Sequence, residues 1–220
     1  SGASAARNTG LAAAKGEYIT EVDADDWLAP DAIEKAMAEA AENTETDFIL
    51  YHTLLVDEKT GTQSPYPIER TAKHVMTGAE ACHLSIGWGI HGWGLCRASI
   101  YRRFPCQTDA GLYGDENSTH LKMLHCREVR LSDGKHFYSV NDSSVTHVVN
   151  MRRFDILEGR MALRQQLIKL GAQHQTIIRQ NKVRGTDFIG VCHLFWLHSS
   201  QFSSADRAQI WQRMEKAYST

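Results

Sequence analysis

Three carboxylates in four residues follow a short β-branched and aromatic run near the start of the chain. Residues 17–22 have the composition of a strand, and Asp23, Asp25 and Asp26 come directly after it. In a folded protein these carboxylates repel one another, and a bound divalent cation removes that repulsion. Ligands of open α/β sheets bind beyond the carboxyl ends of the strands, so a metal with a diphosphate fits this position. On spacing alone, a solvated acidic turn fits equally well.

The remaining pattern predicts an α/β part followed by a helical part. Strands are expected at 17–22, 47–56 and 136–140. Helices of the first part are expected at 4–15, 31–42, 97–103 and 115–126, with a shorter one opened by a capping box at Thr77–Glu80. Beyond residue 150 the strand signals stop, and helices are expected at 154–170, 173–182, 188–198 and 205–218. We therefore expect two units, residues 1–150 and 151–220.

Charge and cysteine content exclude several classes of protein. Lys and Arg number 24 and Asp and Glu 26, a net charge of −2, so nucleic acid is not an expected partner. No apolar run is long enough to span a membrane. The five cysteines are odd in number, widely spaced and without a CxxC pair, which favours neither disulfides nor a zinc ribbon. We expect a protein of the reducing cytoplasm.

The acidic cluster belongs to a longer pattern that resembles the central block of family 2 glycosyltransferases. The resemblance is dense over residues 2–51 and rests on the runs ARNTGL (6–11), AKGEYI (14–19) and VDADDWLAP (22–30). Weaker similarity continues at 93–103, 114–116 and 144–146. It implies a partial GT-A, Rossmann-like sheet with flanking helices and a helical C-terminal extension. The implied activity is metal-dependent, inverting transfer, of hexosyltransferase type, from a nucleotide-diphosphate sugar to a saccharide or lipid-linked acceptor in polysaccharide biosynthesis.

The donor side of the site follows from this resemblance. Asp23 and Asp25 match the family's Asp-x-Asp motif. The first Asp of that motif contacts the ribose or a metal-bound water, and the second coordinates the Mg²⁺ or Mn²⁺ that bridges the diphosphate. Arg7 matches an Arg near the nucleotide diphosphate, or else fixes its helix against the sheet. Asp26 is expected to cap the turn or to hold Arg7, and His147 is either a metal ligand or a surface residue.

The acceptor side follows in the same way. Asp115 and Glu116 fall where the family carries a Glu-Asp pair at the start of a helix, one of which is the general base. The order is reversed here, so position favours Glu116 and side-chain type favours Asp115. Two acids that simply complement the helix dipole are the alternative. Trp93 matches an aromatic residue of the acceptor site, where it would stack on a sugar ring, or else belongs to the core.

The chain departs from the family in lacking the nucleotide-binding half that precedes the matched block. That half comprises about two βα units, on the order of 60–80 residues. We therefore expect an N-terminally incomplete enzyme, weak in isolation, with an exposed sheet edge that favours homo-oligomers. A non-catalytic sugar-binding or scaffold module is the alternative. A phosphatase-like hydrolase is disfavoured, because Asp26 and Trp27 stand where such enzymes carry a Gly-Thr turn.

The helical extension begins with a group of arginines and contains an apolar stretch over Phe188 to Leu197. The arginines are Arg152, Arg153, Arg160 and Arg164. Together these features fit peripheral contact with the inner face of a membrane. Helices that pack on the domain and expose a solvated basic face fit them better.

Overall fold

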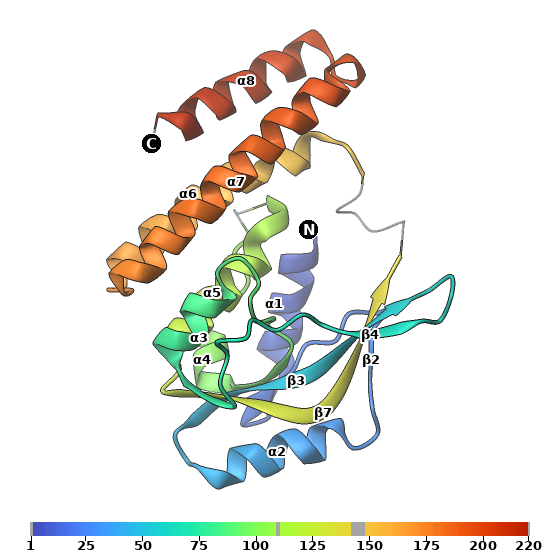
Figure 1. Ribbon diagram of the computed structural model, residues 1–220, viewed down its shortest axis with the longest axis vertical. Coiled ribbons are helices and arrows are strands. Elements are labelled where there is room, and N and C mark those ends of the chain that lie inside the picture. The colour runs from blue at the N-terminus through green and yellow to red at the C-terminus, as the bar shows by residue number, and fades with distance from the viewer. Residues whose placement is uncertain (1, 109–110, 142–147, 220) are drawn as a thin grey trace.

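The computed structural model describes residues 2–108, 111–141 and 148–219 and is organised around a seven-stranded sheet (Figure 1). The strand order is β1-β6-β3-β7-β2, with β4 paired to β3 and β5 paired to β7. Only β3 and β7 run parallel, and the other pairs are antiparallel. The strands are β1 (Tyr18–Ile19), β2 (Trp27–Leu28), β3 (Thr46–Asp57), β4 (Gln63–Pro65), β5 (Val75–Thr77), β6 (Gly94–Arg97) and β7 (Glu128–Val140).

Helices cover both faces of this sheet (Figure 1). One face carries α2 (Ala32–Glu42) alone. The other carries α1 (Ala3–Ala13), α3 (Gly78–Ser85), α4 (Ala98–Arg103) and α5 (Gly114–His125), which the short helix η1 (Gly111–Tyr113) precedes. The expected capping box is present, since Thr77 Oγ1 accepts from Glu80 N and a Glu80 carboxylate oxygen accepts from Thr77 N.

The central strand β3 contains a run of four large apolar residues. Phe48, Ile49, Leu50 and Tyr51 are each at most 1 % exposed. Phe48 and Leu50 join the cluster beneath α1, α3 and α5, whereas Ile49 and Tyr51 join the cluster beneath α2. A strand that is buried on both faces has no polar alternation, and the four consecutive large side chains of β3 agree with that position.

Two strand predictions were wrong in length. The strand expected at 136–140 is β7, which begins eight residues earlier, at Glu128. Its first half was missed because it is rich in charged residues, of which Arg130 pairs with Glu128 in the same strand and with Glu39 of α2. The strand expected at 17–22 pairs only over Tyr18–Ile19, where it meets β6.

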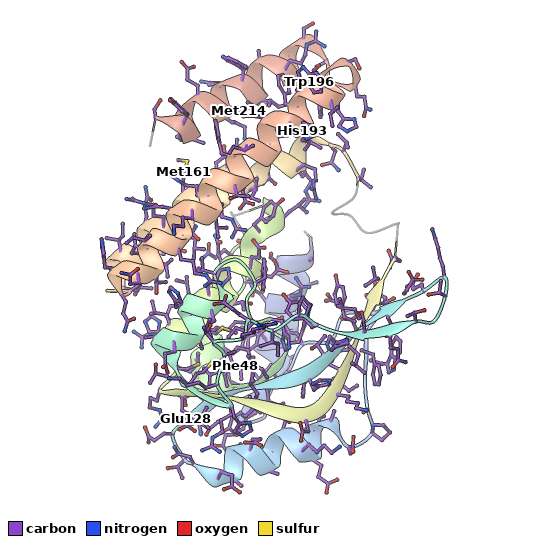
Figure 2. The ribbon with its side chains drawn as sticks, viewed as in Figure 1. Phe48, Glu128, Met161, His193, Trp196 and Met214 are labelled. Carbon is purple, nitrogen blue, oxygen red and sulfur yellow. The ribbon has the colours of Figure 1, made fainter. Side chains whose placement is uncertain are left out.

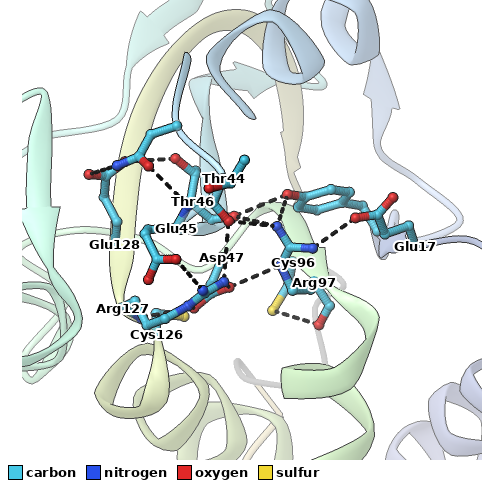
Figure 3. Close-up of polar contacts among 12 residues, drawn as sticks. Glu17, Thr44, Glu45, Thr46, Asp47, Cys96, Arg97, Cys126, Arg127 and Glu128 are labelled. Carbon is cyan, nitrogen blue, oxygen red and sulfur yellow. Dashed lines mark hydrogen bonds and ion pairs between the residues drawn. The ribbon is translucent and has the colours of Figure 1, made fainter. Parts of the chain in front are cut away.

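A buried carboxylate links three neighbouring strands at one edge of the sheet, where β3 and β7 begin and β6 ends (Figure 3). Asp47, in β3, is 2 % exposed and accepts hydrogen bonds from Arg97 at the end of β6 and from Arg127 just before β7. Burial opposes its ionisation, but the hydrogen bonds and charge of Arg127 and Arg97 outweigh burial and lower the pKa of Asp47. The cluster lies at the end of β3 where the strand begins.

The helical extension consists of three long helices, and the expected pair at 173–182 and 188–198 is one helix. The elements are η2 (Met151–Phe154), α6 (Asp155–Lys169), α7 (His174–His198), η3 (Ser199–Gln201) and α8 (Ser204–Tyr218). The gap expected at 183–187 is helical as well, so α7 continues without a break from His174 to His198. No helix in the described ranges is long and apolar enough to cross a membrane.

The extension has a small core of its own and also contributes to the main one. Phe154, Val191 and Ile210 pack between its helices, near Met214, which Figure 2 shows far from Phe48 on the sheet. Leu163 and Leu167 of α6 instead belong to the cluster that contains Phe48 and Leu50. The first helix of the extension is therefore part of the α/β fold's packing.

Some side chains of the apolar stretch in α7 pack in the core of the extension, and others are exposed to solvent. Phe188, Leu194 and Phe195 pack against the extension's core, whereas Trp196 is 74 % exposed and projects from the helix (Figure 2). The alternation follows from helical geometry, because one face of α7 meets α6 and α8 and the opposite face meets solvent. Membrane contact by the exposed face stays a prediction.

Candidate active site

A cleft of about 260 Å³ opens where the loop after β1, the loop before β6 and the start of α5 meet. Five of the residues predicted for the site line it: Arg7, Asp23, Trp93, Asp115 and Glu116. They come from four separate segments of the chain. The cleft lies beyond the end of β1, on the side where an open α/β sheet binds its ligands.

Arg7 connects the acidic loop to the acidic helix start. From α1, its guanidinium lies 2.8 Å from Asp23 Oδ1 and 2.7 Å from Asp115 Oδ2, and its Nε is 3.8 Å from Glu21. Burial alone would lower the pKa of Arg7, but the surrounding carboxylates, Asp115 foremost, raise it. A permanently charged group thus holds two predicted site residues that are far apart in sequence, Asp115 being 108 positions from Arg7.

The Asp26 side chain contacts strand β7. Arg7 pairs with other carboxylates instead. Asp26 Oδ1 accepts a hydrogen bond of 2.9 Å from Ser139 N, and Oδ2 lies 3.2 Å from His136 Nε2. Both partners belong to β7. The expectation that Asp26 holds Arg7 was therefore wrong, because its side chain is turned into the sheet and fastens the acidic loop there.

Asp25 and Asp23 are both exposed, but only Asp23 is paired with Arg7. The Oδ2 of Asp25 is 3.4 Å from the Asn141 amide nitrogen, and Asp25 does not line the cleft. Among the described residues, no three His, Cys, Asp or Glu side chains form a group that could hold a metal by themselves. A single accessible carboxylate fits Mg²⁺ or Mn²⁺, since such ions take one or two carboxylates together with substrate phosphates. His147 lies outside the described residues.

The two acids of α5 have different surroundings. Asp115 accepts from Arg7 through Oδ2 and from the backbone nitrogen of Glu116 through Oδ1. Glu116 is more deeply buried, and its Oε1 accepts a hydrogen bond of 2.9 Å from Trp88 Nε1. Its Oε2 lies 3.3 Å from Arg160 Nη1. Burial raises the pKa of Glu116 despite the opposing effects of Arg160 and Trp88.

The arginines of the helical extension were expected to form a solvated basic face, and for Arg160 this expectation was wrong. Its side chain is only 6 % exposed and is paired with Glu116 and with Asp187 of α7. The sequence contained a signal for this, because Arg160 lies three residues after Leu157 and three before Leu163, on the apolar face of α6. Its position on that face, rather than the local density of arginines, determines its environment.

Trp88 lies in the wall of the cleft. Its backbone has a φ of 63°, the left-handed region that a residue with a side chain rarely adopts. The preceding Gly87, at φ 80°, takes the same region without steric cost. This turn aims the indole N–H at Glu116, while its carbonyl accepts from the Tyr66 hydroxyl. Local sequence contains no signal for that contact.

Trp93 both lines the cleft and packs in a group of aromatic rings. Its ring centroid lies 4.8 Å from that of Tyr138 and 5.3 Å from that of His136 in β7, and 5.7 Å from that of Tyr66. The ring is held from behind by these neighbours and is half-buried. A rigid indole at the edge of a polar cleft is suited to stacking on a sugar ring.

The sheet and its flanking helices are similar in fold to a GT-A glycosyltransferase, and the expected fold class is confirmed. One solved structure with this fold, described as the crystal structure of S. aureus TarS, superposes with a TM-score of 0.54 at 17 % identity. That match covers 79 % of this chain and 28 % of TarS.

The sequence comparisons point in the same direction as the fold. Residues 1–103 match the family model described as Glycosyl transferase family 2. A curated relative, "Putative glycosyltransferase EpsH" of Bacillus subtilis (strain 168), is 37 % identical over 70 residues. That match covers 32 % of this chain and 20 % of EpsH. The chain thus spans a fifth to somewhat more than a quarter of these two proteins.

Proposed function

We propose that this chain carries the metal-facing and acceptor-facing part of an inverting glycosyltransferase that uses a nucleotide-diphosphate sugar. The observation that carries the proposal is the pairing of Arg7 with both Asp23 and Asp115, which brings the acidic loop and the acidic helix start to one cleft. In such an enzyme the leaving diphosphate and the attacking hydroxyl must lie on opposite sides of one sugar ring. Two acidic groups joined across one cleft suit that requirement.

On the donor side, Asp25 would hold the cation, and Asp23 would face the ribose. A bound Mg²⁺ or Mn²⁺ would neutralise the charge that develops on the departing diphosphate. Arg7 keeps Asp23 in place and adds a fixed positive charge to the wall of the cleft. Asp26, fastened to β7, keeps the loop from moving when the nucleotide binds.

On the acceptor side, we assign the general base to Glu116. Both oxygens of Asp115 already accept hydrogen bonds, one of them from Arg7. The raised pKa of Glu116 makes it the stronger base as long as it is ionised. Its carboxylate takes the proton of the acceptor hydroxyl while that oxygen bonds to the anomeric carbon. The bond from this carbon to the phosphate oxygen breaks, the nucleoside diphosphate leaves with the electron pair, and the configuration inverts.

Binding of Mn²⁺ with and without UDP tests the donor side by isothermal titration calorimetry. We expect the chain to bind Mn²⁺ measurably only when UDP is present, and Asp25→Asn to abolish that binding. Asp31→Asn is the matched control. Asp31 is a solvent-accessible acid six residues after Asp25, and it pairs with Lys35. Equal binding by wild type and Asp25→Asn would contradict the metal assignment. Binding of a free saccharide without UDP would favour a sugar-binding module.

Release of nucleoside diphosphate from a panel of nucleotide sugars tests the base. Glu116→Gln removes the base with little change of shape, so we expect kcat to fall by about 10²–10⁴-fold. Asp115→Asn should instead raise KM more than it lowers kcat, because it loosens Arg7. The reverse pattern would assign the base to Asp115.

A further inference from the structure

A buried arginine of the helical extension reaches the active site. Arg160 of α6 places its guanidinium between two carboxylates: Nε donates to Asp187 Oδ2 at 2.6 Å, and Nη1 lies 3.3 Å from Glu116 Oε2. A buried cation is costly unless it is paired, so its position is determined by these two acids. One of them lines the cleft, and the other belongs to α7.

The backbone around Arg160 is fixed against α5 and α7 by further polar contacts. The Asn117 side-chain amide donates to Gly159 O at 3.1 Å, and the Gln180 amide donates to Arg160 O at 3.2 Å. Asn117 follows Glu116 directly, so the same turn of α5 carries both the carboxylate and the bond that sets the register of α6. The guanidinium therefore has little freedom to leave Glu116.

We propose that Arg160 is a positioning residue of the active site, which holds the Glu116 carboxylate against Trp88 and keeps it ionised. The proposal rests on the proposed function, in which Glu116 is the base. It gives the helical extension a part in the chemistry, because the group that controls the base comes from α6 and is itself oriented by α7.

The groups around Glu116 predict the direction in which each substitution should shift the pKa of its carboxyl group. The charged and titratable groups that face its carboxylate are Asp115 of α5, Tyr113 of η1, Arg160 of α6 and Asp187 of α7. Burial raises the pKa of Glu116, Arg160 lowers it, and Asp115 and Asp187 raise it. Removing the charge of Arg160 must therefore raise this pKa, and removing the charge of Asp187 must lower it.

The indole N–H of Trp88 provides a readout that needs no substrate. It donates to Glu116 Oε1, so its ¹H–¹⁵N resonance should shift when Glu116 takes up a proton. Trp88→Phe identifies this resonance among those of the five tryptophans, and Glu116→Gln should abolish its titration. The midpoint measured on the otherwise unchanged chain is the reference for the variants below.

We expect Arg160→Gln to move this midpoint upward by about 1–3 pH units, since an opposite charge this close changes a carboxyl pKa by that much. Arg160→Lys should restore most of the difference. Asp187→Asn should move the midpoint downward. Arg164→Gln is the matched control, one turn further along α6 and bonded to Asn181, and should leave the midpoint unchanged.

Equal midpoints in wild type and Arg160→Gln would overturn the proposal, as would shifts of the same sign in Arg160→Gln and Asp187→Asn. If Arg160→Gln does not fold, Arg160→Lys and Asp187→Asn still decide, because neither leaves an uncompensated buried carboxylate at Glu116. In the release of nucleoside diphosphate from nucleotide sugars, the acid limb of kcat/KM should follow the same midpoints. Midpoints that shift without any change in the rate profile would remove Glu116 from the base role and overturn the proposed function alone.

Discussion

At the scale of single residues, the most constrained charge of the fold is the Asp47 carboxylate. Four donor groups from Arg97 and Arg127 surround it, and no water-facing alternative exists for a side chain that is 2 % exposed. Replacing one member of such a buried group leaves the other charges without compensation. Its contribution therefore concerns the stability of the sheet rather than the chemistry of the cleft.

We predict that Asp47→Asn lowers the free energy of unfolding at pH 7 by about 3 kcal/mol. The folded-state pKa of Asp47 is lowered from its ordinary value of 3.8, so its contribution is complete above about pH 4 and is lost as the pH falls through the lowered pKa. The difference between wild type and variant in urea unfolding should shrink below pH 4.

Glu45→Gln is the control for this prediction. Glu45 is an exposed partner of the same Arg127, and its replacement should have no measurable effect. A variant difference in Asp47→Asn that stays constant from pH 7 to pH 3 would contradict the ionic explanation.

The role of a single residue could be predicted from the sequence when a short motif or a helical pattern around it indicated that role. Asp23, Asp115 and Glu116 could be selected from their motifs, and the structure brings them to one cleft. The role of Arg7 as the link between them could not, because its partner lies 108 positions away. Arg160 could have been recognised from its place on the apolar face of α6, since helical periodicity was already visible in the sequence.

At the scale of elements, local pattern identified those whose side chains are uniform in character. The apolar run of β3 and the capped start of α3 were predicted correctly. The first half of β7 was missed because a central strand is determined by pairing with β3 and β5, which propensity does not record. The two helices expected at 173–182 and 188–198 form one helix, α7, because packing against α6 and α8 stabilises the helix over its whole length.

We predict that Gly185→Ala and Gly190→Ala each stabilise the protein by about 0.5–1 kcal/mol. Both glycines lie inside α7, and an added Cβ would meet no atom within 4 Å at either position. Alanine restricts the unfolded chain and adds no clash in the folded one. Thermal unfolding followed by far-UV circular dichroism should show a higher Tm for each.

Gly94→Ala provides the opposite case for the same measurement. A Cβ at Gly94 would lie 2.0 Å from Ile49 O in the neighbouring strand, so we expect a lower Tm. A decrease of Tm in the α7 variants would mean that a surface outside this chain covers those glycines.

At the scale of the whole molecule, the extension and the α/β part share a core. Leu163 and Leu167 pack with Phe48 and Leu50, and polar contacts from α5 to α6 cross the boundary expected near residue 150. Two units joined in this way should not unfold independently. We therefore predict one cooperative transition for the chain.

This prediction can be measured after Trp196→Phe and Trp211→Phe, which remove two exposed indoles of the extension. The remaining fluorescence reports on the α/β part, while ellipticity at 222 nm is dominated by the long helices of the extension. Coincident urea midpoints of the two signals would agree with a shared core. Loss of ellipticity at a lower urea concentration would indicate an extension that unfolds first.

The parallel pairing of β3 with β7 has a consequence for the newly made chain. The ends that meet, at Thr46 and Glu128, are 82 residues apart, so the apolar face of β3 is synthesised long before its partner. At about 5–20 residues per second, that interval is on the order of 4 to 16 s. Until then Phe48 and Ile49 lack the strand beside them. Chaperones should therefore bind the exposed apolar residues of β3 while the segment between β3 and β7 is being synthesised. This binding should end once β7 has emerged from the ribosome.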